Sequence, residues 1–377
     1  MALQYCLDTT LRTGMGKKRP SKTSQHHGVE EFDFVAAGHQ GEADGDEDNL
    51  GSALLDIIKA VDVDRLRTVA GAGTSFECLL VIMNWMHKWQ QEYECIMSSL
   101  TLYTETLSRN LDDNEAQEDT AGEIKEIEDE GVQVLAGFEK IALALLRSDS
   151  FVPIDLLDDM GWTLLMQAAN CGAASFVHAL VHDFDADIEK RQHNHSLGTP
   201  ALARAIDAGH VDVLGDLCNA AMANAVFKYK CDDDEAADDE VHTPLTLACR
   251  GGHENIVSFL LGQGTVDVNL KLPDSEDSAL HIAVCFDMEA IVKLLLQHPT
   301  TDINATNAQG YTAAFGCSNA ALVDTLLSHG LDSTIEGFQG ETLLDMALAL
   351  GDEDVATIVC TRLEADALAA VATNQSS

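Results

Sequence analysis

The clearest pattern of apolar and polar positions in the chain lies between residues 242 and 269. Thr243 and Pro244 are typical of a helix start, because a threonine side chain caps free N–H groups and proline needs no donor in the first turn. Apolar residues follow at helical spacing, and Gly251 and Gly252 predict the end of this helix. A second helical stripe consists of Ile256, Val257, Leu260 and Leu261. The segment therefore predicts two short amphipathic helices and an extended turn.

A small residue recurs where the two helices of each predicted pair would touch. The positions are Ala168, Ala205, Ala248, Ala283, Cys317 and Ala347, at intervals of 37, 43, 35, 34 and 30 residues. One helix pair cannot bury its own apolar face, so such units have to stack on one another. The pattern predicts a helical solenoid in which one interval carries an insertion and another a shortened unit.

The segment TPLTLACRGGH at residues 243–253 resembles an ankyrin repeat in its TPLxxA opening and in the Gly-His between its helices. Related stretches are WTLLMQAANCG, TPALARAIDAGH, SALHIAVCFD, YTAAFGCS and ETLLDMALALG. The resemblance covers residues 160–363 well and residues 53–73 weakly. It implies an all-α fold, an α-solenoid of about six ankyrin repeats, with a helical N-terminal region and a disordered acidic leader.

Residues 1–50 are predicted to be a disordered leader, since residues 30–48 hold eight acidic side chains and no Lys or Arg. Residues 51–150 are predicted to form a helical N-terminal region. Within it we expect a long helix over 76–108, an acidic loop with a frayed helix over 112–130 and a further helix over about 132–146. This region is either a cap or a degenerate repeat split by a helical insertion, and both alternatives stay open.

The ankyrin repeat domain is predicted to span residues 151–365, followed by a C-terminal tail over 366–377. An insertion at residues 219–241 interrupts it. We expect its first part to extend a second helix. Its second part is an acidic loop with seven carboxylates among residues 232–240.

The amino-acid composition limits the kinds of partner that the chain is expected to bind. The formal net charge is −41, from 22 Lys and Arg against 63 Asp and Glu. Such a field repels nucleic acids and anionic membranes and favours a basic protein partner, although it also serves solubility alone. The ten cysteines form no CxxC pair, which is typical of reduced thiols in a cytoplasmic or nuclear protein. We recognise no secretory signal and no apolar run long enough to span a membrane.

No catalytic constellation is apparent, so we expect no enzyme activity and no cofactor. His178 and His182 have the i, i+4 spacing of zinc ligands, and His193 and His195 follow. No further residues complete a metal motif, so a structural role is favoured and no metal is expected. The resemblance implies that His281 hydrogen-bonds backbone between repeats.

The resemblance also implies candidate contact residues on the concave face. These are Trp162, Asn170, Asp207, His242, Arg250, Asp277, Phe286 and Tyr311. In the acidic insertion we add Asp232, Asp233, Asp234 and Glu235 as contacts for a basic partner. Asn269 and Asn304 lie in the pattern that asparaginyl hydroxylation uses in ankyrin proteins, which makes them candidate modification sites.

The sequence supports two hypotheses of function. The first is a non-enzymatic adaptor, scaffold or regulatory subunit that binds a protein partner through the concave face. The alternative is an acidic chaperone or inhibitor that masks a basic client protein. Both place the protein in the cytoplasm or nucleus, and both leave the oligomeric state open.

Overall fold

The computed structural model of the protein describes residues 64–65, 74–110, 114–148, 152–158, 160–192, 198–229 and 240–374. These residues belong to two compact units, of which the first ends at Asp187 and the second begins at Ile188. The predicted leader lies outside the described residues, as does most of the weakly matched segment 53–73. Residues 230–239 of the insertion, with Asp232, Asp233, Asp234 and Glu235, also lie outside them.

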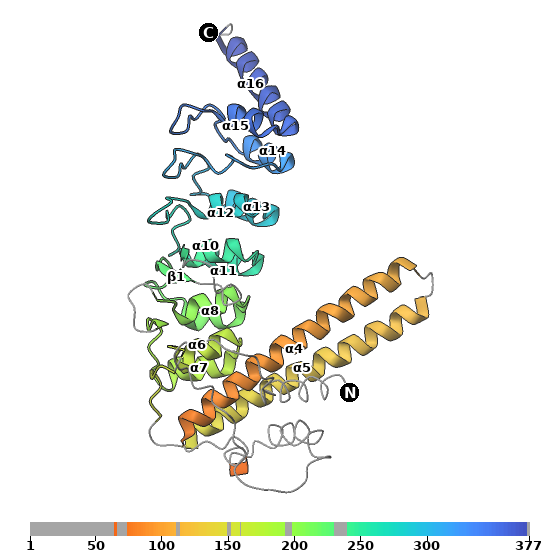
Figure 1. Ribbon diagram of the computed structural model, residues 1–377, viewed down its shortest axis with the longest axis vertical. Helices are drawn as coiled ribbons and strands as arrows, with labels where there is room; N and C mark the ends of the chain where they lie inside the picture. Colours follow the sequence, from red (N-terminus) through yellow and green to blue (C-terminus); the bar gives the residue numbers. More distant parts are fainter. Residues whose placement is uncertain are drawn as a thin grey trace, which may run out of the picture. The chain divides into compact units, whose positions relative to one another are not determined.

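The first unit begins with a long helical hairpin (Figure 1) made of α4, Ser75–Asn110, and α5, Asn114–Ser148. Thr74 and Glu77 cap α4 reciprocally. The Thr74 Oγ1 accepts from the Glu77 N–H at 3.2 Å, and the Glu77 Oε2 accepts from the Thr74 N–H at 3.0 Å. The long helix predicted over 76–108 is therefore confirmed.

The loop predicted over 112–130 is wrong, because α5 is helical from Asn114 onward. Its acidic residues are compatible with a helix. Glutamate, glutamine, alanine and lysine are good helix formers, and acidic residues near a helix N-terminus are stabilised by the helix dipole. The two predicted segments 112–130 and 132–146 are thus one helix.

The core of the first unit lies between facing apolar stripes of this hairpin. On α4 the buried residues are Leu79, Ile82, Met83, Met86 and Trp89, and on α5 they are Val134, Phe138, Ile141, Ala142 and Leu145. The rings of Trp89 and Phe138 are 6.2 Å apart. Full burial of each large apolar side chain contributes about 1.5–3 kcal/mol, so this stripe holds the hairpin together.

A shorter helix pair, α6 (Leu164–Asn170) and α7 (Ala174–His182), follows in the same unit. Helix α4 packs against α6, and α5 packs against α7. The first helices of the two pairs, α4 and α6, thus contact each other, and so do the second helices, α5 and α7. Neighbouring helical repeats pack in the same way. Whether residues 51–150 are a cap or a degenerate repeat split by a helical insertion stays a prediction.

The second unit stacks further helix pairs. The loops that connect one pair to the next, which we call arms, project from one side of the stack (Figure 1). Its elements are α8 (Ala201–Asp207), η3 (Val211–Val213), α9 (Leu214–Leu217), β1 (Phe227–Tyr229), β2 (Glu240–His242), α10 (Pro244–Arg250), α11 (Glu254–Gly262), α12 (Ala279–Cys285), α13 (Glu289–Gln297), α14 (Ala320–Ser328), α15 (Leu343–Leu350) and α16 (Glu353–Asn374).

Helix α16 covers most of the segment predicted as a C-terminal tail. No helix among the described residues has both the length and the apolar character that crossing a membrane requires.

The pair α10–α11 forms as its sequence predicts. Thr243 caps α10 in a capping box with Thr246, and Pro244 occupies the first turn. The small residues aligned along the chain are buried at Ala168, Ala205, Ala248, Ala283 and Ala347. Cys317 differs, because residues 313–316 form turns and no first helix is described before α14. Gly316 has a φ of 78° there, in the left-handed region that a right-handed helix does not use.

The extension of a second helix into the insertion is also wrong. Helix α9 ends at Leu217, and the chain reaches a two-stranded antiparallel ladder through turns. In this ladder Phe227 pairs with His242, and Tyr229 pairs with Glu240. Phe227 is fully buried and anchors the ladder in the stack. The fold is therefore a mostly helical solenoid with one short β-ladder at the base of the insertion.

Candidate protein-binding surface

The predicted contact residues occupy two rows on the helix pairs. One row lies immediately before the cap of a first helix, and the other lies at the C-terminal end of a first helix. The first row holds Trp162, His242 and Asp277, and the second holds Asn170, Asp207, Arg250 and Phe286. Tyr311 lies instead before the turns at residues 313–316, where no first helix is described.

Tyr311 binds a neighbouring arm instead of facing solvent alone. Its ring stacks on Phe315 with centroids 4.7 Å apart, and its hydroxyl donates to the Glu341 carboxylate. This hydrogen bond raises the pKa of Tyr311 and lowers the pKa of Glu341. A Cβ atom on Gly337 would lie 2.2 Å from Tyr311 Cε1, so the ring packs directly on glycine backbone.

Asp277 and His281 also link neighbouring units. The Asp277 Oδ1 accepts from Asn307 Nδ2 at 3.0 Å. The His281 Nε2 lies 3.0 Å from the carbonyl oxygen of Tyr311, and its Nδ1 lies 2.8 Å from Ser278 Oγ. A carbonyl only accepts, so Nε2 carries the proton. Burial lowers the pKa of His281. The predicted structural role of His281 between repeats is confirmed.

His242 and Arg250 meet at Glu240, the last carboxylate of the predicted acidic loop. The Glu240 Oε2 lies 3.2 Å from His242 Nε2 and 3.0 Å from Arg250 Nη1. His242 is buried, and this burial lowers its pKa. The strand β2 brings the pair together, because residues two apart on a strand share a face. The cluster fixes the end of the ladder to the end of α10.

In the first unit, Trp162 and Asn170 are half-buried. The backbone N–H of Trp162 donates to Asp158 Oδ1 at 2.8 Å, and the backbone N–H of Asp158 donates to the Trp162 carbonyl at 2.8 Å. The Asn170 Nδ2 lies 3.2 Å from His87 Nδ1 on α4. Of the remaining candidates, Asp207 and Phe286 are exposed.

Asn269 and Asn304 form a ladder between successive turns. The Asn269 Nδ2 donates to the Thr300 carbonyl at 2.6 Å, and its Oδ1 accepts from the Asp302 N–H at 2.8 Å. Asn304 makes the same two bonds to Gly330 and Asp332, and Asn224 makes them to Thr265 and Asp267. The hydroxylation hypothesis stays a prediction, and an enzyme would have to reach side chains that already bridge two turns.

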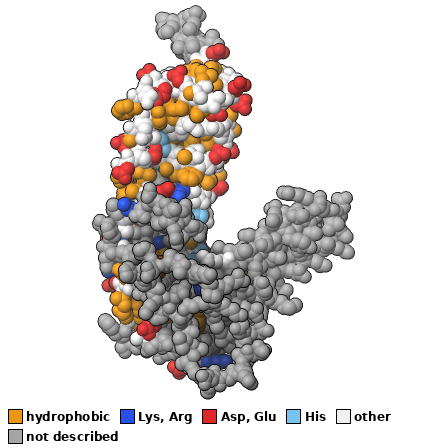
Figure 2. Space-filling model, in the orientation of Figure 1, with side chains coloured by type: hydrophobic (Ala, Val, Ile, Leu, Met, Phe, Trp, Pro, Cys, Tyr) orange, Lys and Arg blue, Asp and Glu red, His pale blue; other side chains and the backbone are white. Residues whose placement is uncertain are grey.

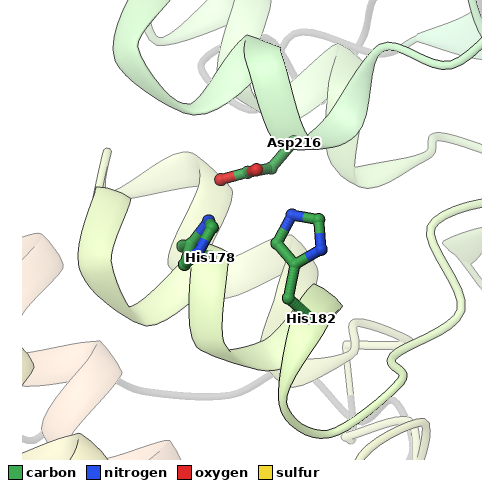
Figure 3. Close-up of side chains that lie close together, drawn as sticks. All are labelled: His178, His182 and Asp216. Atoms are coloured by element: carbon green, nitrogen blue, oxygen red, sulfur yellow. The ribbon is translucent and has the colours of Figure 1, made fainter.

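The histidine pair on α7 is exposed (Figure 3), with the two rings 4.4 Å apart. The packing role favoured by the sequence is therefore not one in the core. Figure 3 also labels Asp216 of α9, which belongs to the second unit. Within the first unit, His178 and His182 offer two ligands, whereas a zinc site needs at least three from the protein. His193 and His195 lie outside the described residues.

The described cysteines include three that are buried, Cys78, Cys171 and Cys249. Burial raises the pKa of Cys171 to about 12 and also raises the pKa of Cys249. Such thiols stay protonated and pack as small apolar side chains. Cys285 and Cys360 differ, because both are exposed.

Comparison with known proteins agrees with this architecture. Residues 217–307 match the family model described as ankyrin repeats (3 copies). This match confirms the resemblance that the sequence carries, and the segment consists of ankyrin repeats. Among solved structures, the ankyrin repeat domain of Bcl-3, described as a unique member of the IκB protein family, is similar at 24% identity and a TM-score of 0.46, over 60% of this chain and 92% of that chain.

A second similar structure is a chain from the complex of the predatory endopeptidase Bd0816 of Bdellovibrio bacteriovorus with the immunity protein Bd3460. It has 21% identity and a TM-score of 0.42, and the match covers 55% of this chain and 99% of that chain. The assignment of the fold rests on the helix pairs and the family match, not on these two likenesses.

Proposed function

We propose that the protein is a non-enzymatic interaction module, an adaptor, scaffold or regulatory subunit, that binds a protein partner through the arms and first helices of its second unit. One observation carries this proposal. The exposed large apolar side chains described in this unit are Phe286, Phe338, Leu348 and Leu350. All four belong to first helices, their ends or an arm.

The second helices show the opposite distribution. Among the described residues of α11, α13, α14 and α16, the large apolar side chains are buried or half-buried. A solvent-facing surface without exposed apolar anchors is a poor binding face, while aromatic anchors are favoured in interfaces. Phe338, which is 84% exposed in the arm before α15, is the leading anchor.

Co-purification tests this function. The full chain carrying an affinity tag should retain a partner from extract, and Phe338→Ser should reduce the retained amount several-fold. The matched control is Gln297→Ala, an exposed position on α13. Equal retention by the two variants, or no specific partner at all, would contradict the proposed surface.

The alternative, an acidic chaperone or inhibitor of a basic client, is favoured by the net charge of −41. Salt separates the two functions, because charge-dominated binding weakens steeply with ionic strength whereas an apolar anchor loses little. Retention that collapses between about 50 and 300 mM salt would favour the alternative.

A further inference from the structure

In the last three repeats of the second unit, the turns that precede the second helices α13, α14 and α16 lie side by side. The Asn319 Nδ2 donates to Asp287 Oδ1 at 2.6 Å, and the Ser318 Oγ donates to Asp352 Oδ2 at 3.2 Å. Each of these bonds joins one turn to the next. We name this surface the turn strip and define it as residues 285–287, 316–319 and 348–352.

The middle of the turn strip is shortened. The caps of a first and a second helix are ten positions apart at Thr243 and His253. The corresponding Thr312 and Asn319 are only seven positions apart. A Cβ atom on Gly316 would have no neighbour within 4 Å. The centre of the strip is therefore open beside its backbone.

Large apolar side chains flank this centre. Phe286 is 45% exposed on one side, and Leu348 and Leu350 are 63% and 56% exposed on the other. Leu348 stands six residues after its cap, Thr342, as Cys249 and Val284 do after theirs. Those two residues are only 0% and 3% exposed. Leu348 thus occupies a position that the fold buries elsewhere.

The charge around the strip has one sign. The sequence contains no Lys or Arg from residue 294 to residue 361, and nine Asp and Glu residues lie in that span. On the face shown in Figure 2, acidic and apolar side chains are visible over the C-terminal part of the second unit, without basic ones. Burial raises the pKa of Cys317, and the nearby Asp287 and Asp352 carboxylates raise it further. Both carboxylates therefore lie close to the centre of the strip.

We propose that the turn strip docks a cationic segment of a protein partner that also carries large apolar side chains. The apolar side chains cover Phe286, Leu348 and Leu350, and lysine or arginine side chains neutralise Asp287 and Asp352. The inference deepens the proposed function, because it names the partner's chemistry and a site for it. A second copy of the chain is a poor occupant, since each copy carries a formal charge of −41.

The test uses the full chain and a fluorescent peptide of alternating arginine and leucine, with an arginine–serine peptide for comparison. Anisotropy should show the arginine–leucine peptide binding at least about tenfold more tightly than the arginine–serine peptide. The double variant Phe286→Ser, Leu350→Ser should lose at least about tenfold in affinity. Val132→Ser, at an apolar residue of the first unit that is 69% exposed and lies outside the strip, is the matched control and should bind as the parent does.

A second variant tests the charges without touching the apolar residues. The double variant Asp287→Asn, Asp352→Asn should lower the salt dependence of peptide binding. Equal binding by the parent and the Phe286/Leu350 variant, or equal binding of both peptides, would overturn the proposal. If partner retention still depends on Phe338 in that case, the turn strip is not the site but the proposed function stands. If neither the turn-strip variant nor Phe338→Ser changes partner retention, both the turn-strip proposal and the proposed function are contradicted.

Discussion

Gly337 controls how closely two neighbouring arms approach. Its missing side chain leaves room for the Tyr311 ring, whose Cε1 would be 2.2 Å from an added Cβ. We predict that Gly337→Ala lowers the free energy of unfolding by about 1–3 kcal/mol, because the ring must leave its stack on Phe315 or strain the arm. Urea unfolding measures the change.

Gly262 provides the matched control for this substitution. It lies at the end of α11, and an added Cβ would have no atom within 4 Å. Gly262→Ala should leave stability unchanged or raise it by about 0.4–1 kcal/mol, since alanine restricts the unfolded chain. Similar losses in both alanine variants would show that Tyr311 does not pack tightly on Gly337.

His281 links the stability of the stack to pH. Because burial lowers its pKa in the folded state, the unfolded chain binds a proton at higher pH than the folded chain. Its contribution is complete above the unfolded pKa of about 6.5 and is lost as the pH falls below that value. We predict that His281→Thr, which imitates Thr246 in the capping box of α10, makes the fall in melting temperature from about pH 7 to pH 5 shallower.

The comparison of the two proteins isolates one histidine from the many other groups that titrate in this range. Asp277 and Lys271 act electrostatically on His281 with opposite signs, and both remain in the variant. Parallel melting curves over the pH range would mean that His281 is protonated equally in the folded and unfolded chains.

At the scale of elements, the asparagine ladder joins turns that share no helix. Asn304→Ala removes a donor to the Gly330 carbonyl and an acceptor from the Asp332 N–H. We predict a loss of about 1–3 kcal/mol in unfolding free energy, because two backbone groups lose their partner at once. Gln263→Ala, an exposed position at the end of α11, should change stability by less than about 0.5 kcal/mol. Denaturant unfolding of both variants decides this, and matching values would show that water replaces the ladder at no cost.

The helix pairs could be predicted because each one has a local start and stop. The start and end of a helix are set by residues within a few positions, such as Thr243, Pro244 and the following glycines. These signals can therefore be recognised without knowledge of distant contacts. The ladder of β1 and β2 could not be predicted in this way. Each strand has three residues, which is too short to show alternation, and its partner lies across the acidic insertion.

The candidate site could be predicted only as positions within the repeat. The resemblance named Asp277 and Tyr311 as contact residues, and this stays a prediction. Their hydrogen-bond partners, Asn307 and Glu341, each lie 30 residues further along the chain, and no local pattern reveals such a contact. Phe338 was not predicted, because it lies in an arm outside both rows of contact residues, and only the structure shows that it is 84% exposed.

At the scale of the whole molecule, the charge of −41 works against compactness. Like charges repel more strongly in the folded chain, where they are closer together, and salt screens this repulsion. The ion pairs described between side chains, such as Lys293 with Glu289 at 2.5 Å, lie at the surface, and exposed pairs contribute little.

We therefore predict that the melting temperature rises when sodium chloride increases from about 20 to 200 mM, since the Debye length shortens from about 20 Å to under 10 Å. Screening of surface ion pairs acts in the opposite direction, but only 22 basic residues face 63 acidic ones, so net repulsion should dominate. Potassium chloride at equal ionic strength is the control for a specific ion effect. A melting temperature that falls with salt would mean that ion pairs, rather than repulsion, dominate the electrostatics of the fold, and that a cationic partner would gain less by binding than its charge implies.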